Sequence, residues 1–253
     1  MGVFAGIEPT WSKETNNGRR HIATRGSVQS GLVLNLDAGV LSSYPGSGTT
    51  WADLSSTNSN GTLTNGPTYS SANGGSLSFD GSNDYISLGK SFISTGEIGS
   101  GDISYTLEAW FKYNGTPGAL PDGWSIIGNS SQYGIGMQLA SNKVNFGYRS
   151  NSNFDSTATL SPGNWYHVVC TREAGNSTYL NRIYINGQWD STYNTSNYLY
   201  ITNTTAEMQI GWADTRITGR YEGNIAIVRL YNTFLTDQQV LENFTTDRFR
   251  FGI

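Results

Sequence analysis

The stretch "SYTLEAWFKY", residues 104–113, decides the fold class, because its side chains alternate with a period of two. The odd-numbered residues from Tyr105 to Phe111 point to one side, and the even-numbered residues from Thr106 to Lys112 point to the other. Successive side chains of a strand face opposite ways, whereas an amphipathic helix repeats its apolar residues every three to four positions. The stretch therefore predicts a β-strand.

Other short runs of the chain have the same character, and Gly, Asn, Ser and Pro separate them. We expect strands at residues 31–39, 125–129, 134–140, 143–149, 164–173, 182–189, 207–213 and 221–232. The pair Asn186-Gly187 is a strong signal for a two-residue hairpin turn. Many short strands with turn residues between them predict an all-β fold, a two-sheet antiparallel β-sandwich of the jelly-roll kind, within residues 31–253.

One short C-terminal helix is expected in "LTDQQVLENF", residues 235–244. Thr236 and Gln239 have the spacing of a capping box, in which each side chain bonds the other residue's backbone N–H. Val240 and Phe244 share one apolar face. We expect this helix to pack on the rim of the sandwich.

The composition favours a β protein with an uncharged polar surface. Of the 253 residues, 36% are hydrophobic but only 13% are charged, about half the usual share. The net charge is −4 without a long run of either sign, so no nucleic-acid partner is expected. The single cysteine, Cys170, follows an apolar run and is expected to be a buried, inert thiol. The N-terminus is too polar for a signal peptide, and we expect no membrane segment.

Residues 1–30 form a separate segment, which we interpret as an extended N-terminal arm. They carry four basic and two acidic side chains, a net charge of +2, whereas the remaining chain is net −6. They show no alternation, and we expect them to order on a partner instead of folding alone. The candidate anchoring residues are Phe4, Ile7, Trp11, Arg19, Arg20 and Arg25.

The segment "FDGSNDY", residues 79–85, places two carboxylates and an amide on one short loop. It is compatible with a calcium site, with half of a hydrolase active site, or with a plain hairpin turn. Asp80-Gly81 is a favoured turn pair, and the loop lacks the spaced acidic ligands of an EF-hand. We favour the turn and expect neither metal nor cofactor; Asp80 and Asp84 are the only weak metal candidates.

No catalytic set is recognisable. A glycosidase needs two carboxylates that flank the scissile bond, and Glu108 has no acidic residue at i+2 or i+4. His167 is expected to be a packed strand residue, and no Gly-x-Ser-x-Gly elbow occurs. The sequence therefore predicts that the protein is not an enzyme.

Aromatic residues in loop-like stretches are candidates for carbohydrate binding, because exposed rings stack on sugar faces. The chain has 15 Tyr and 7 Trp, most of which must belong to the core. The candidates outside clear strands are Tyr44, Trp124, Tyr133, Tyr193 and Tyr198.

These motifs occur in an order that resembles the concanavalin A-like lectin/glucanase superfamily, in its laminin G-like jelly-roll branch. The segments that carry the resemblance are "GLVLNLDAG", "SYPGSGTTWADLS", "GSLSFDGSNDYISLG", "TLEAWFK", "NWYHVVCTRE", "IYINGQ" and "YEGNIAIVRLYNTFLTDQQVLENF". It covers about residues 31–245, and it implies a two-sheet sandwich and, in many members, glycan recognition. Many relatives carry an acidic pair where this chain has Ala226 and Ile227; loss of that Asp, which often supports calcium, argues against a bound metal.

The opening at residues 31–71 and the C-terminal "LENFTTDRFRFGI" also resemble virion proteins of tailed bacteriophages, notably marine and cyanobacterial ones. This resemblance implies a structural virion protein, either a capsid decoration or a tail appendage, that is made in the host cytoplasm and located on the virion surface. Its expected partners are other virion proteins, through residues 1–30, and host surface glycans; several copies per particle are expected. The alternatives are a carbohydrate-binding lectin module, alone or on a tail fibre, and a glycoside hydrolase, which the residues favour least.

Overall fold

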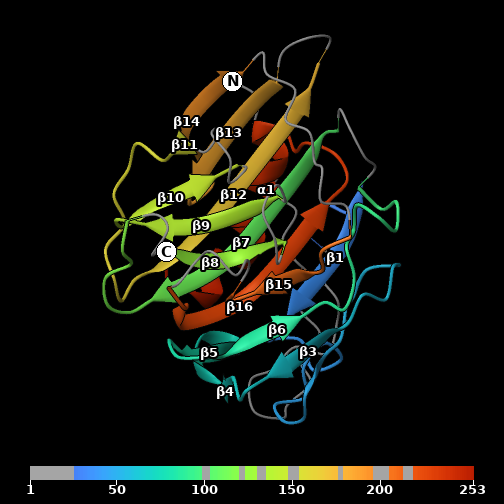
Figure 1. The fold of residues 1–253 in the computed structure, drawn as a ribbon, viewed down its shortest axis with the longest axis vertical. Coiled ribbons are helices and arrows are strands. Elements are labelled where there is room, and N and C mark those ends of the chain that lie inside the picture. The colour runs from blue at the N-terminus through green and yellow to red at the C-terminus, as the bar shows by residue number, and fades with distance from the viewer. Residues whose placement is uncertain are drawn as a thin grey trace, which may run out of the picture.

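The computed structural model describes residues 26–98, 103–119, 123–129, 135–147, 154–175, 179–195, 205–212 and 219–253. They form two antiparallel sheets of eight strands each, which pack face to face (Figure 1). Sheet 1 runs in the order β14 (Gln188–Thr195), β13 (Tyr179–Ile185), β12 (Trp165–Ala174), β7 (Tyr105–Tyr113), β16 (Glu222–Tyr231), β5 (Ser76–Asp80) and β4 (Thr68–Ser70), with β1 (Leu32–Asp37) also paired to β16. Sheet 2 runs β11 (Phe154–Asp155), β10 (Lys143–Phe146), β9 (Gly136–Ala140), β8 (Trp124–Asn129), β15 (Met208–Ile210), β6 (Tyr85–Ser87), β3 (Gly61–Thr64) and β2 (Thr50–Trp51).

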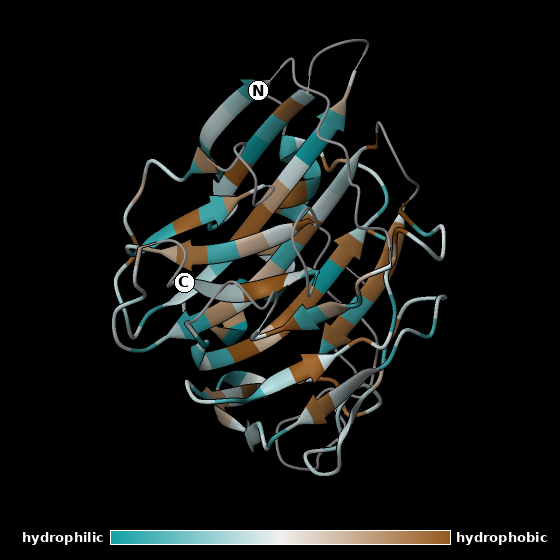
Figure 2. Ribbon diagram, in the orientation of Figure 1, coloured by the Kyte–Doolittle hydropathy of each residue, from teal (hydrophilic) through white to brown (hydrophobic). Residues whose placement is uncertain are grey.

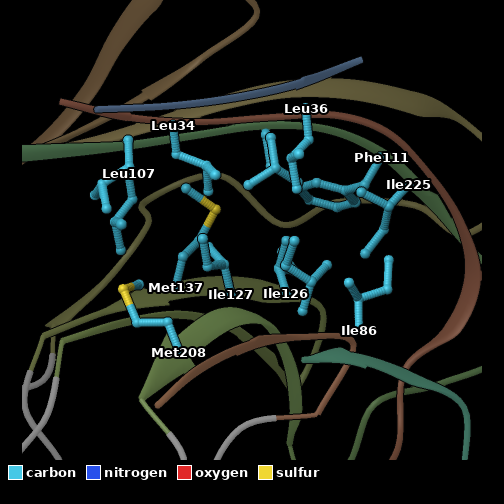
Figure 3. Packing of buried hydrophobic residues seen from close by; sticks show 14 of the residues in the cluster. Leu34, Leu36, Ile86, Leu107, Phe111, Ile126, Ile127, Met137, Met208 and Ile225 are labelled. Carbon is cyan, nitrogen blue, oxygen red and sulfur yellow. The ribbon is translucent and has the colours of Figure 1, made fainter. Parts of the chain in front are cut away.

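The expected fold class is confirmed. Hydrophobic residues gather in the strands of both sheets (Figure 2), and one cluster fills the space between the sheets. In Figure 3, Leu107 and Phe111 of β7 face Ile127 of β8 and Met137 of β9 across this core. Cys170 lies in the same core, fully buried, and burial raises the pKa of its thiol, so its expected inertness follows.

The hairpin turn that the sequence predicts at Asn186-Gly187 is also confirmed. Asn186 and Gly187 both have positive φ, 51° and 75°, and they join β13 to β14 in a two-residue turn. The Asn186 side chain accepts a hydrogen bond from the backbone N–H of His167 at 3.0 Å, which ties the hairpin tip to β12. In the described chain no helix is long and apolar enough to cross a membrane.

Helix α1 (Asp237–Asp247) has the expected capping box between Thr236 and Gln239. Its expected position on the rim is wrong, because it lies across the outer face of sheet 1, behind that sheet in Figure 1. The outward side chain of Trp110 on β7 explains this position, since it is fully buried under two rings. Phe244 of α1 stacks on it at 5.8 Å, and Phe251, after the 3₁₀ turn η2 (Arg248–Arg250), stacks at 4.2 Å.

A buried polar network also holds α1 on sheet 1. Its centre is Arg229 of β16, which donates from Nη1 to Glu108 Oε1 at 2.7 Å and from Nη2 to Asp247 Oδ2 at 2.8 Å. The other oxygen of Glu108 accepts from the Asn243 side chain at 2.6 Å. Asn243 in turn accepts from the backbone N–H of Val28 at 2.7 Å. The network therefore joins two strands, the helix and the beginning of the described chain.

The segment 26–30, which the sequence places in the arm, is part of this folded body. Val28 is 7% exposed and packs in a cluster with Val240 and Tyr231. The Gly26 carbonyl accepts from Thr246 Oγ1 at 2.8 Å. The segment therefore contributes to the core beside α1; it packs there because the apolar Val28 and its backbone N–H both find partners on the helix. The six anchoring candidates of the arm, Phe4 to Arg25, lie outside the described residues.

We predict that Arg229→Met lowers the free energy of unfolding by about 3–5 kcal/mol, because it leaves the buried carboxylates of Glu108 and Asp247 without their cation. Urea denaturation at neutral pH measures the change. Arg182→Met is the control: Arg182 is partly exposed and lies 3.6 Å from Glu173, so its loss should cost less than about 1 kcal/mol. Equal losses in the two variants would show that the network does not hold the fold.

Candidate functional site

The loop between β5 and β6 is a self-contained turn. Asp80 Oδ1 accepts from the backbone N–H groups of Ser82 at 2.8 Å and Asn83 at 3.4 Å, and Asp84 Oδ2 accepts from the Asp80 N–H at 3.1 Å. Gly81 provides the positive φ of 76° that the bend requires. Both carboxylates therefore accept backbone hydrogen bonds within the turn, as the turn interpretation predicts. Within the described ranges, no group of three or more His, Cys, Asp or Glu side chains is placed to hold a metal ion.

Ala226, for which the resemblance implies an acidic counterpart in many relatives, faces α1 and the C-terminal tail. It is fully buried in a cluster with Trp110, Phe244 and Phe251. A carboxylate in this position would lie among apolar side chains. The apolar residue is therefore consistent with the packing of the tail onto sheet 1.

Glu108, the carboxylate considered for catalysis, has a structural position. Its side chain is fully buried, and one oxygen accepts from Arg229 while lying 3.2 Å from His167 Nε2. Burial alone would raise the pKa of Glu108, but the charge of Arg229 and the hydrogen bond with His167 outweigh burial and hold it at about 2. A permanently ionised carboxylate without solvent access cannot donate a proton to a substrate. His167 itself is fully buried against Trp110 and Phe244, as expected for a packed strand residue.

Only one of the five candidate carbohydrate-binding rings is exposed within the described chain. The expectation is wrong for Tyr44, which is 2% exposed and donates to the Gly48 carbonyl, and for Trp124, which is 9% exposed and packs against Tyr113. Both rings turn inward because neighbouring core aromatics surround them. Tyr133 and Tyr198 lie outside the described residues. Tyr193 on β14 is 41% exposed and stacks on Phe154 of β11, with centroids 5.7 Å apart.

A row of polar side chains crosses the outer face of sheet 2. We call Ser125, Gln138, Asn145 and Asp155 the polar row. Register pairs connect Ser125 to Gln138, Gln138 to Asn145, and Asn145 to Asp155, so the four side chains lie on adjacent strands. Their sequence neighbours Met137, Leu139, Val144 and Phe146 belong to the core, so the row faces away from it.

The hydrogen bonding of the polar row is incomplete. Asn145 donates to Asp155 Oδ1 at 2.8 Å, and Asp155 is exposed at the sheet edge. Ser125 Oγ and Gln138 Oε1 are buried and have no hydrogen-bond partner in the part of the chain that the structure describes. More than 90% of buried polar groups in proteins have a partner, so these two atoms require an explanation, as do other such atoms of the described chain, for example Trp51 Nε1 and Thr171 Oγ1.

A second group lies on the other half of the same face. Gln209 of β15 and Ser87 of β6 are register partners, and Ser87 Oγ donates to Glu207 at 2.7 Å. Tyr85, two residues before Ser87, makes an edge-to-face contact with Trp212 at 5.3 Å. The outer face of sheet 2 therefore offers amides, carboxylates, hydroxyls and aromatic rings together.

The polar row escaped recognition in the sequence because its members are single polar residues inside apolar strands. "GMQLA" and "KVNF" show the alternation, but an outward Gln or Asn is ordinary on a solvent-facing strand. Only the strand order and register bring the four side chains together. Their burial, which distinguishes them from ordinary surface residues, has no signal in the sequence.

The two stacked antiparallel sheets and the polar outer face define a lectin-like jelly-roll sandwich. The family described as the concanavalin A-like lectin/glucanases superfamily matches residues 80–241, and the chain belongs to this superfamily. No curated protein matches the sequence.

Solved structures that share this fold include an arabinanase domain, a sialidase and a toxin binding domain. Domain 4 of AbnA, a GH43 extracellular arabinanase from Geobacillus stearothermophilus, solved with arabinotriose, superposes with a TM-score of 0.63 at 16% identity over 85% of this chain and 99% of that one. Trypanosoma rangeli sialidase with sialic acid gives 0.60 at 17% identity over 87% of this chain. The binding domain of botulinum neurotoxin DC with SialylT gives 0.61 at 16% identity over 87% of this chain.

The chain spans 33% of the sialidase and 52% of the toxin domain. At these identities the likeness shows the shared fold and nothing beyond it.

We predict that acid removes stability through Glu108. Its pKa is about 2 in the folded chain against 4.5 as a free group, so its contribution is complete above pH 4.5 and is lost as the pH falls toward 2. The shift corresponds to about 3 kcal/mol. Urea denaturation between pH 6 and pH 3 should show a smaller pH dependence for Glu108→Gln than for the original chain, whereas the exposed control Glu242→Gln should leave it unchanged. An unaltered pH dependence in Glu108→Gln would contradict the assignment.

Proposed function

We propose that this protein is a non-catalytic glycan-binding protein on the surface of a tailed-phage virion, anchored through its N-terminal arm. The observation that carries the glycan-binding part is the polar row, with two buried acceptors that lack partners. Sugar hydroxyls are both donors and acceptors, so they match the amide, hydroxyl and carboxylate groups of the polar row. Tyr193 adds an exposed ring at the edge of the sandwich, stacked on Phe154, which precedes Asp155 in β11.

The binding face and the anchor point have a favourable arrangement. Residues 26–28 are tied to α1, on the outer face of sheet 1, whereas the polar row lies on the outer face of sheet 2. The two sheets separate these regions (Figure 1). An arm that leaves beside α1 would therefore direct the polar row away from the particle. The virion context itself rests on the resemblance of residues 31–71 and of the C-terminal segment to phage virion proteins.

The second candidate function is that of a glycoside hydrolase, and its candidate catalytic carboxylate is Glu108. Glu108 is committed to Arg229, and its substitution by Gln would disturb the fold instead of a reaction. We expect the purified protein to release no reducing sugar from any polysaccharide that it binds.

We predict that Tyr193→Ala and Asp155→Ala each weaken binding to glycans found on a glycan array by about tenfold, because each removes an exposed contact. Trp189→Ala is the matched control. Trp189 lies on the same strand and is 61% exposed, but it pairs with the outward residue Tyr184 on the other face of sheet 1. Loss of binding in the control, with no loss in the other two variants, would place the site elsewhere. If no glycan on the array binds, the glycan-binding part of the proposal is wrong and only the structural role remains.

We predict that deletion of residues 2–25 abolishes incorporation into phage particles and leaves the folded body intact. The deletion keeps Gly26 and Val28, whose contacts with α1 belong to the fold. Thermal unfolding of the purified truncated chain should match that of the original chain within a few degrees. Normal incorporation of a truncated chain that folds would overturn the anchoring role.

A further inference from the structure

Arg172 on β12 is a buried cation without an anion. It lies on the inner side of sheet 1, the side of Cys170, and is 2% exposed. Its Nε donates to the Ile103 carbonyl at 3.2 Å, and its guanidinium carbon lies 4.0 Å from the centroid of the Tyr179 ring. Its Nη1 is buried and has no hydrogen-bond partner among the described residues. Burial of an unpaired charge is costly, so this arrangement requires an explanation.

The comparison with Arg229 makes the anomaly clear. Both side chains are buried in sheet 1, on opposite faces. Arg229 contacts two carboxylates, at 2.7 and 2.8 Å, whereas no carboxylate in the described chain forms an ion pair with Arg172. In the described chain Arg229 therefore has two carboxylate partners, whereas the guanidinium of Arg172 contacts the Ile103 carbonyl and the Tyr179 ring.

The strand neighbours of Arg172 connect it to Tyr193, the exposed ring among the carbohydrate-binding candidates. Its register partners are Tyr105 on β7 and Asn181 on β13, and Asn181 is the register partner of Tyr193. These four residues form a row across the inner face of sheet 1. The row ends at Tyr193, its exposed member.

Aromatic contacts close this row into a ring that includes sheet 2. Tyr193 stacks on Phe154, Phe154 contacts Phe146 at 5.7 Å, and Phe146 contacts Tyr105 at 6.0 Å. The strand position of Arg172 thus belongs to a ring of residues from both sheets, while its guanidinium contacts the Ile103 carbonyl and the Tyr179 ring. The Tyr193 hydroxyl makes no hydrogen bond in the described chain, so stacking on Phe154 is its main restraint, and we place the entrance there.

We infer that Arg172 binds the carboxylate of an acidic sugar, a uronic or sialic acid residue of the glycan, which enters past Tyr193. This inference rests on the proposed function and specifies its ligand class. A guanidinium presents paired N–H donors that match a carboxylate, and such charge-assisted bonds are stronger than neutral ones. A neutral sugar offers Nη1 only a hydroxyl oxygen, which is a weaker acceptor for a guanidinium than a carboxylate, so the residue selects acidic glycans over neutral ones.

The experiment compares acidic and neutral sugars on the full chain. Affinities for 3′-sialyllactose and lactose, and for glucuronic acid and glucose, are measured by NMR titration on the original chain, Arg172→Met and Arg182→Met. Arg182 lies on the neighbouring strand with its side chain on the opposite face and provides the matched loss of one positive charge. Thermal unfolding is recorded for each variant.

We expect the original chain to bind the acidic member of at least one pair about tenfold or more tightly than the neutral member. Arg172→Met should lose this preference, keep its binding of neutral sugar, and unfold at the same or a higher temperature, because an unpaired buried charge has been replaced by an apolar side chain. Arg182→Met should keep the preference. Equal binding of acidic and neutral sugars by the original chain, or a preference that survives Arg172→Met, would overturn the inference.

A result without any sugar binding would count against the proposed function instead. Acetate then tests the anion site alone. Thermal stabilisation of the original chain by acetate, absent in Arg172→Met, would support a carboxylate site at Arg172. Equal effects of acetate on the two chains would overturn it.

Discussion

The arrangement of the molecule depends on the ion pairs and the hydrogen bond that the guanidinium of Arg229 makes. A charge buried in sheet 1 must be compensated, and its partners come from segments far apart in the chain: Glu108 on β7, Asn35 on β1 and Asp247 on α1. Because these partners must meet at one point, the helix cannot lie on the rim. Asn243 extends the same network to Val28, so the N-terminal side of the fold is fixed beside the helix.

This constraint gives the two outer faces different roles. The outer face of sheet 1 is sealed by Phe244, Phe251 and the network, and its one carboxylate with an enzyme-like position, Glu108, is held ionised and out of reach. The outer face of sheet 2 carries polar side chains whose hydrogen bonding is incomplete. Both faces contain buried polar atoms without hydrogen-bond partners in the described chain, among them Thr171 Oγ1 on sheet 1 and Ser125 Oγ and Gln138 Oε1 on sheet 2. Helix α1 and the C-terminal tail cover the outer face of sheet 1. This covering supports sheet 2 as the binding face.

The features that depend on neighbouring residues could be predicted from the sequence. The alternation in residues 104–113, the turn at Asn186-Gly187 and the capping box at Thr236 all depend on local geometry, and all are confirmed. The helix position could not be predicted, because an outward Trp110 is indistinguishable in sequence from an exposed one. Glu108 shows no acidic neighbour along its strand, whereas its actual partner Arg229 is 121 residues away. The burial of Tyr44 and Trp124 has no signal in the sequence, because only long-range packing decides which loop aromatics turn inward.

The account places glycan binding on the outer face of sheet 2 and at its edge near Tyr193, opposite the sealed face. A crystal structure of the full chain with the glycan that binds it most tightly tests this claim most directly. The account predicts a sugar in contact with Asp155 and Tyr193, with hydrogen bonds to members of the polar row. A sugar bound only on the α1 side of sheet 1, with the polar row unchanged, would contradict it.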